Sequence, residues 1–174
     1  MTGVQTCALP ILELIVLDVD GTMTDSRISY SANGDEIKSF NVKDGLAIAS
    51  WRKLGKQVAI ITGRKSDIVA RRAKELNIEH FYQGVKNKKE VLEGLLLKLD
   101  LTMESVATIG DDLNDLQMIK ASKISFVPRD ASIFVEKEAT VILTKKGGDG
   151  AVRDRKSTRL KLQSPAISRM PSSA

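Results

Sequence analysis

The stretch Ile15-Val16-Leu17-Asp18-Val19-Asp20-Gly21-Thr22 carries an apolar run directly into two acidic residues. The run has the composition of a buried strand and ends where the acids begin. Two carboxylates one residue apart repel each other and need solvation or a cation, so this is a poor way to end a strand for stability alone. The carboxyl ends of parallel strands are, however, where α/β proteins build their sites. We therefore predict a functional strand end, with an Asx turn as the structural alternative.

Three later apolar runs also lead into polar residues. They offer a hydroxyl, a lysine and an acid pair, at Thr62, Lys88 and Asp111-Asp112. Phosphoryl transfer through an aspartyl-phosphate needs a carboxylate nucleophile, a second acid, phosphate-binding groups and a cation site. Each of these strand ends is weak evidence alone, but all four in this order favour that chemistry.

Apolar runs of strand length alternate with helical patterns along the body of the chain, which predicts a doubly wound, mostly parallel α/β sheet of the Rossmann-like kind. Aromatic residues make up only 4% of the sequence, and the abundant aliphatic residues suit a parallel sheet buried on both faces. The expected strands cover residues 12–18, 57–62, 80–82, 106–110, 124–127 and 140–143. The expected helices cover residues 44–54, 66–76, 88–99, 112–120 and 131–136.

Residues 26–41 break this alternation. Two short β-like segments flank Asn33-Gly34, and Asn-Gly is the strongest short signal for a hairpin turn. We expect a β-hairpin flap and no cap domain, because the interval between Asp20 and Thr62 is too short for a lid and no long insertion follows Lys88. The site is then open unless another subunit covers it.

The formal net charge of +5 is not spread over the chain. Six basic residues and one acidic residue after residue 151 account for all of it, so the preceding body is neutral. This distribution argues against a nucleic-acid-binding module, which needs a basic surface on the folded domain. We expect residues 1–10 to be a foreign or disordered leader, residues 11–153 to be the domain, and residues 154–174 to be a basic tail, disordered or foreign.

Composition also bears on compartment. The single cysteine, Cys7, excludes an internal disulfide and fits a cytoplasmic protein. No apolar stretch reaches the length of a membrane span, so we expect no membrane partner.

Together these motifs resemble the haloacid dehalogenase superfamily of phosphatases, whose four motifs match in order between Asp18 and Asp115. Two further segments, Phe40-Asn41-Val42-Lys43-Asp44-Gly45 and Gly147-Gly148-Asp149-Gly150-Ala151-Val152-Arg153, are similar to the subfamily that dephosphorylates the sugar acid 3-deoxy-D-manno-octulosonate 8-phosphate, a precursor of lipopolysaccharide. The likeness covers about residues 12–153. It implies a haloacid dehalogenase fold and a homotetramer of capless subunits in which neighbouring chains wall each site.

The resemblance also implies roles for individual residues. Asp18 is expected to attack phosphorus and Asp20 to act as general acid and base, with Thr62 and Lys88 as the remaining catalytic residues. A magnesium ion is expected on Asp18, the backbone carbonyl of Asp20, and Asp111. These oxygen ligands suit Mg²⁺ and disfavour Zn²⁺.

Other residues of these motifs are expected to support the metal or to bind substrate. Asp112 and Asp115 would orient ligands, and Asp115 is expected within reach of Lys88. Lys86 competes with Lys88 for the catalytic role, but the family spacing favours Lys88. Substrate contacts are expected from Asp20, Asn41, Val42, Lys43, Asp44, Gly45, Gly63, Arg64, Arg72 and Lys88.

Four alternatives stay open. The substrate is another sugar acid phosphate, such as an acylneuraminate 9-phosphate, or the chain is a non-catalytic domain that promotes oligomerisation. A receiver-like phospho-acceptor also presents acids, Thr and Lys at strand ends, but it lacks a second acid such as Asp20. A phosphotransferase of the mutase type usually needs a cap that excludes water, and none is expected here.

Overall fold

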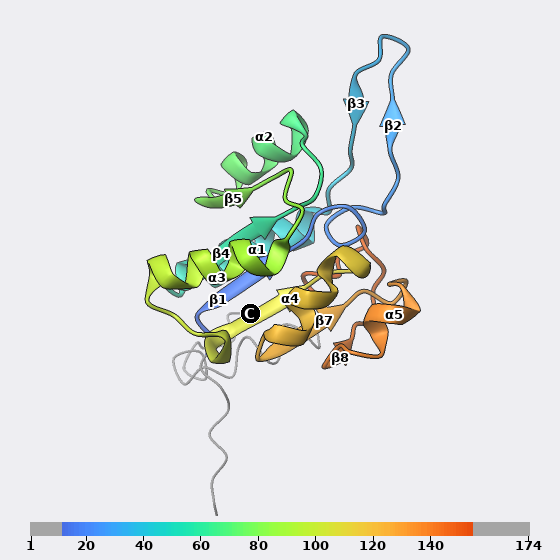
Figure 1. Cartoon of the computed structure of the whole chain (residues 1–174). Helices are drawn as coiled ribbons and strands as arrows, with labels where there is room; N and C mark the ends of the chain where they lie inside the picture. Colours follow the sequence, from blue (N-terminus) through green and yellow to red (C-terminus); the bar gives the residue numbers. More distant parts are fainter. Residues whose placement is uncertain (1–11, 155–174) are drawn as a thin grey trace, which may run out of the picture.

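A computed structural model of the chain describes residues 12–154 (Figure 1). Its centre is a six-stranded sheet in the order β5-β4-β1-β6-β7-β8, and every neighbouring pair is parallel. The doubly wound fold predicted from the sequence is confirmed. The strands are β1 (Leu14–Leu17), β4 (Gln57–Ile61), β5 (His80–Tyr82), β6 (Val106–Ile109), β7 (Ile124–Val127) and β8 (Val141–Ile142).

Helices cover both faces of this sheet (Figure 1). The helices are α1 (Val42–Lys53), α2 (Asp67–Glu75), α3 (Lys88–Leu99), α4 (Leu116–Ala121) and α5 (Ile133–Glu136), with short 3₁₀ turns η1 (Met103–Ser105) and η2 (Leu113–Asp115). Successive strand residues point to opposite faces, so Ile15 and Leu17 pack with α1 and α2, whereas Leu14 and Val16 pack with α3 and α4. All four residues of β1 are buried, as expected for a central parallel strand.

A separate two-stranded antiparallel hairpin, β2 (Ser29–Tyr30) with β3 (Glu36–Ile37), projects from the body of the molecule (Figure 1). Its turn contains Gly34 at φ +86°, a conformation that favours glycine. The hairpin predicted from Asn33-Gly34 is therefore present.

Helix α3 begins where predicted, and the other four helix starts differ from the predicted ones by one to four residues. Helix α1 begins at Val42 and not at residue 44, because the Asn41 side chain accepts a hydrogen bond from the backbone N–H of Lys43 and caps the helix. The helix expected over 112–120 begins as the 3₁₀ turn η2, in which Asp112 and Asp115 form a reciprocal capping box.

The last described residue, Asp154, is hydrogen-bonded to the domain. Asp154 is buried, and its Oδ2 accepts hydrogen bonds from the backbone N–H and the hydroxyl of Thr144, at 2.5 and 2.7 Å. Asp154, which we expected to open the tail, therefore belongs with the folded domain. The predictions for residues 1–10 and 155–174 lie outside the described residues. Within residues 12–154, no helix combines the length and the apolar character that crossing a membrane requires.

Candidate active site

The parallel register brings three strand ends together. Leu17 of β1 is paired with Ile60 of β4 and with Ile109 of β6. The residues that follow these strands therefore lie side by side, and they include Asp18 and Asp111. The backbone N–H of Asp18 donates to the carbonyl of Ile109 at 2.9 Å, which fixes the first acid against the end of β6.

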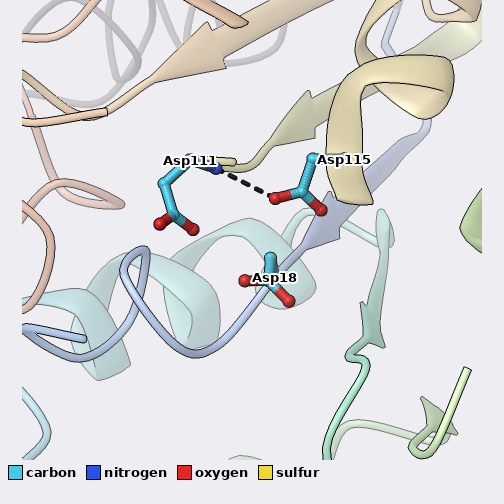
Figure 2. Close-up of side chains that lie close together, drawn as sticks. All are labelled: Asp18, Asp111 and Asp115. Carbon is cyan, nitrogen blue, oxygen red and sulfur yellow. Dashed lines mark hydrogen bonds between the residues drawn. The ribbon is translucent and has the colours of Figure 1, made fainter. Parts of the chain in front are cut away.

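Three carboxylates converge at this edge of the sheet (Figure 2). Asp18, Asp111 and Asp115 each place a carboxylate oxygen within 4.8 Å of the other two. The Oδ2 of Asp115 accepts hydrogen bonds from the backbone N–H groups of Asp111 at 3.0 Å and of Asp112 at 3.4 Å. Asp112 is exposed and its carboxylate accepts from the backbone N–H of Leu113, so Asp112 shapes the turn that presents Asp111.

Lys88 lies between two of these carboxylates. It is the first residue of α3, and its buried Nζ donates to Oδ1 of Asp18 and to Oδ1 of Asp115, both at 2.6 Å. The contact expected between Asp115 and Lys88 is therefore confirmed. Lys86 is exposed, so the site lysine is Lys88. Burial opposes the charge on Lys88, but the attraction of Asp18 and Asp115 outweighs it and raises the pKa of the ammonium.

The cluster holds more negative charge than Lys88 neutralises. Burial, followed by repulsion from Asp115, raises the pKa of Asp18 to about 6 despite the neighbouring Lys88. Burial, followed by repulsion from Asp18 and Asp115, raises the pKa of Asp111 to about 8. A divalent cation between these oxygens would relieve the repulsion and return both groups to the ionised form.

The donor set fits Mg²⁺ because it consists of oxygen atoms. Asp115 already uses its two oxygens on Lys88 and on backbone N–H groups, so we assign it to orientation and not to coordination. Gly21, at φ +96°, leaves room for the Asp111 carboxylate, because a Cβ at position 21 would lie 1.9 Å from Oδ2 of Asp111. The hydroxyl of Thr22 donates to Oδ1 of Asp111 at 3.4 Å and helps to orient it.

Asp20 follows Asp18 by two residues but has a different partner. Its Oδ1 forms an ion pair with Nζ of Lys38, whose side chain is fully buried. Nζ of Lys38 also lies 3.6 Å from Oε1 of Glu36. Sequence reasoning missed both residues, because Lys38 and Glu36 belong to a hairpin whose short, polar strands look like a solvated loop.

The end of β4 presents the predicted hydroxyl. Thr62 is buried, its backbone N–H donates to the carbonyl of Tyr82 at 2.9 Å, and its carbonyl accepts from Val85 at 3.1 Å. Gly63 and Arg64 follow directly, and the Arg64 guanidinium donates to Oε1 of Glu36 at 3.0 Å. The predicted substrate contact of Arg64 stays a prediction, since its observed partner is the hairpin.

The expected substrate segment forms the first turn of α1. Val42 and Lys43 are exposed there, whereas Asp44 and Gly45 are buried. Oδ1 of Asp44 accepts from the backbone N–H of Arg153 at 2.8 Å. A Cβ on Gly45 would lie 2.7 Å from the guanidinium of Arg72, which places that arginine beside the segment.

The late glycine loop packs against the acid-bearing loop after β1. A Cβ on Gly147 would lie only 1.9 Å from the carbonyl oxygen of Gly21. The backbone N–H of Gly148 donates to the carbonyl of Thr22 at 3.2 Å, and its carbonyl accepts from the Asn41 side chain at 3.4 Å. This loop therefore joins the acid-bearing loop to the start of α1.

The haloacid dehalogenase-like hydrolase family matches residues 34–123, which include Thr62, Lys88, Asp111 and Asp115. The sheet order and the acid and lysine cluster agree with this match. The chain belongs to the haloacid dehalogenase-like hydrolases.

Individual named proteins match most of the chain. A 3-deoxy-D-manno-octulosonate 8-phosphate phosphatase of Haemophilus influenzae is 38% identical over 152 residues, which span 87% of this chain and 84% of that protein. The crystal structure of such a phosphatase from Yersinia pestis matches with a TM-score of 0.86 and 36% identity, over 91% of this chain and 85% of that one. A third, from Moraxella catarrhalis, was solved in complex with a magnesium ion, a phosphate ion and a KDO molecule. It matches with a TM-score of 0.84 and 39% identity, over 88% of this chain and 87% of that one.

Proposed function

We propose that this chain hydrolyses a sugar acid phosphate, 3-deoxy-D-manno-octulosonate 8-phosphate, with Mg²⁺ as cofactor. The observation that carries the proposal is the buried Asp18 at the end of β1, held by Lys88 beside Asp111. The relatives named above carry this activity in their names and match most of the chain.

Asp18 is the nucleophile of the proposed reaction. One of its oxygens forms a bond to phosphorus while the bond from phosphorus to the sugar oxygen breaks. Asp20 delivers a proton to that leaving oxygen, and then accepts one from the water that hydrolyses the aspartyl-phosphate. The products are the free sugar acid, inorganic phosphate and unmodified Asp18.

The surrounding groups stabilise charge during these steps. Lys88 orients the Asp18 carboxylate and offers a fixed ammonium to the phosphoryl oxygens. Thr62, whose backbone is fixed by hydrogen bonds to Tyr82 and Val85, would donate its hydroxyl to the same group. Mg²⁺, held by Asp18, Asp111 and the carbonyl of Asp20, would reduce repulsion between carboxylate and phosphate.

We assign the sugar part of the substrate to the start of α1, the residues after β4 and one arginine of α2. These residues are Asn41, Val42, Lys43, Asp44, Gly45, Gly63, Arg64 and Arg72. Arg64 and Arg72 offer planar donors suited to a carboxylate, and both lie near the N-terminus of α1 or the hairpin.

A phosphate-release assay with magnesium tests the function. The substrates are 3-deoxy-D-manno-octulosonate 8-phosphate, an acylneuraminate 9-phosphate and a simple sugar phosphate. We expect hydrolysis of the first to exceed that of the others and to stop in excess chelator. A preference for the acylneuraminate ester would reassign the substrate, and turnover that survives the chelator would refute the metal-dependent mechanism.

We also propose that the chain forms a homotetramer through its hairpins. Ile28, Tyr30 and Ile37 are about half exposed or more, at 49%, 63% and 50%, on a hairpin that projects from the domain. Ile37 is paired with Ser29, so Ile37 and Tyr30 lie on opposite faces of the hairpin. Exposed apolar side chains on both faces favour contact with other surfaces. Light scattering after size exclusion measures the assembly, and a monomer with full specific activity at high dilution would refute it.

A cytoplasmic location is the last part of the proposal, and it rests on the single cysteine of the sequence. Fractionation of expressing cells, with activity measured in each fraction, tests it.

A further inference from the structure

Lys38 is a buried lysine whose position is set by the hairpin. It follows β3 directly, and its side chain has no exposed surface. A buried ammonium is costly unless it is paired, because it loses its hydration. Its partners are Asp20, through an ion pair to Oδ1, and Glu36, at 3.6 Å.

Glu36 links Lys38 to the body of the domain, because it also accepts hydrogen bonds from residues that follow β4. Its Oε1 accepts from Arg64 at 3.0 Å, and its Oε2 accepts from the hydroxyl of Ser66 at 2.5 Å. The Ser66 hydroxyl also caps α2, so β3 is fastened to a helix end. The hydrogen bond from Ser66, with the charges of Lys38 and Arg64, lowers the pKa of Glu36. The carboxylates of Asp20 and Glu36 and the cations of Lys38 and Arg64 thus form one network with no net charge.

Asp18 and Asp20 are therefore held by different lysines. Lys88 forms an ion pair with the nucleophile Asp18, and Lys38 forms one with Asp20. We propose that Lys38 is a positioning residue, which fixes the Asp20 carboxylate in the orientation needed for proton transfer to the leaving oxygen. The inference rests on the proposed function, because it assumes that Asp20 is the general acid.

The leaving group distinguishes positioning from a general structural role. A sugar alkoxide leaves poorly and needs a proton from Asp20, whereas p-nitrophenolate leaves well without one. In single-turnover measurements, Lys38→Met should slow release of the sugar acid by roughly 10- to 100-fold, less than the ~10²–10⁴-fold typical of losing a general acid outright. It should change the burst of p-nitrophenol from p-nitrophenyl phosphate by less than about threefold, with KM for the sugar acid phosphate nearly unchanged.

A double-mutant cycle completes the test. Because Lys38 acts only through Asp20, adding Lys38→Met to Asp20→Asn should slow sugar acid release no further. Lys38→Arg, which keeps the charge, should recover part of the rate, and Lys74→Met on the exposed face of α2 is the control. Glu36→Gln supplies a second variant should Lys38→Met fold poorly, and it should slow the same step in the same substrate-dependent way.

The outcomes separate the inference from the proposed function. Additive losses in the cycle, or a raised KM with equal effects on both substrates, would overturn the positioning role and make Lys38 a substrate ligand. Equal rates for Lys38→Met and wild type, with Asp20→Asn slow, would overturn the inference alone. Unchanged sugar acid release in Asp20→Asn would overturn the proposed role of Asp20 itself.

Discussion

Within residues 12–154, Lys88 is the one cation that contacts the carboxylate cluster of Asp18, Asp111 and Asp115, of which Asp18 and Asp115 are buried and Asp111 is half-buried. Its removal should therefore be costly both to stability and to catalysis. In Lys88→Met the side chain keeps similar bulk but loses the ammonium that donates to Asp18 and Asp115 at 2.6 Å. Removing one partner of a buried ion pair costs roughly 3–5 kcal/mol, because the other charge stays buried without compensation.

That cost converts into a measurable change in melting temperature. For a domain of this length, 1 kcal/mol corresponds to roughly 2–4 °C, so the metal-free variant should melt roughly 6–20 °C below wild type. The loss should be greater at pH 8 than at pH 5, since Asp18 and Asp111 already have raised pKa values of about 6 and about 8 and take up protons at lower pH. Turnover should fall by about 10²–10³ or more, as for other preorganised charge-stabilising donors.

The assay is thermal unfolding with and without Mg²⁺ at both pH values, beside steady-state phosphate release. Lys86→Met is the matched control. Lys86 is exposed and lies two residues before Lys88, so its replacement should leave the melting temperature and the turnover unchanged. A Lys88→Met protein that melts within 2 °C of wild type at pH 8 without metal would refute the reasoning that Lys88 compensates the carboxylates.

Three further results are expected. Asp18→Asn should abolish turnover and covalent labelling by substrate phosphate, and steady turnover in this variant would place the nucleophile elsewhere. Gly147→Ala should destabilise the domain by roughly 1–3 kcal/mol, because its Cβ would lie 1.9 Å from a backbone carbonyl oxygen. Gly94 lies in open space on α3, so Gly94→Ala should instead stabilise the domain by about 0.5–1 kcal/mol. Chemical denaturation of both variants measures these changes. Without metal, the pKa values of Asp18 and Asp111 are about 6 and about 8 in the folded protein, against 3.8 in the unfolded chain. The folded protein therefore binds more protons between these values, so its stability should fall as pH rises from about 4 to about 8. Added Mg²⁺ should therefore raise the melting temperature more at pH 8 than at pH 5, and an equal rise at both would contradict the assigned pKa shifts.

The sequence could predict the fold and the strand-end chemistry because both depend on local patterns. Apolar runs identify buried strands, and the parallel topology then brings Asp18, Thr62 and Asp111 to one edge without further information. Lys88 was separable from Lys86 only through family spacing, and its burial between two acids depends on where α3 begins.

The hairpin residues could not be predicted in this way. Glu36 and Lys38 gain their roles from contacts with Arg64, Ser66 and Asp20, which lie 18 to 30 positions away along the chain. Local composition carries no signal for such docking, because charged residues beside a turn usually face solvent. The early start of α1 has a simpler cause, since Asn41 is a strong helix cap and the glycine at position 45 obscured the pattern.

The contact between the late glycine loop and the loop after β1 means that the site can be completed only late in synthesis. β1 and the loop that carries Asp20 emerge early from the ribosome, because a nascent chain emerges from its N-terminus. Gly147 and Gly148, which brace that loop at the Gly21 and Thr22 carbonyls, emerge more than a hundred residues later. A nascent chain can therefore contain the nucleophile, the site lysine and the metal-binding acids while the loop between them is still unsupported. We expect phosphatase activity to arise only in nascent chains in which Gly147 and Gly148 have emerged, so that shorter ones do not consume phosphate esters.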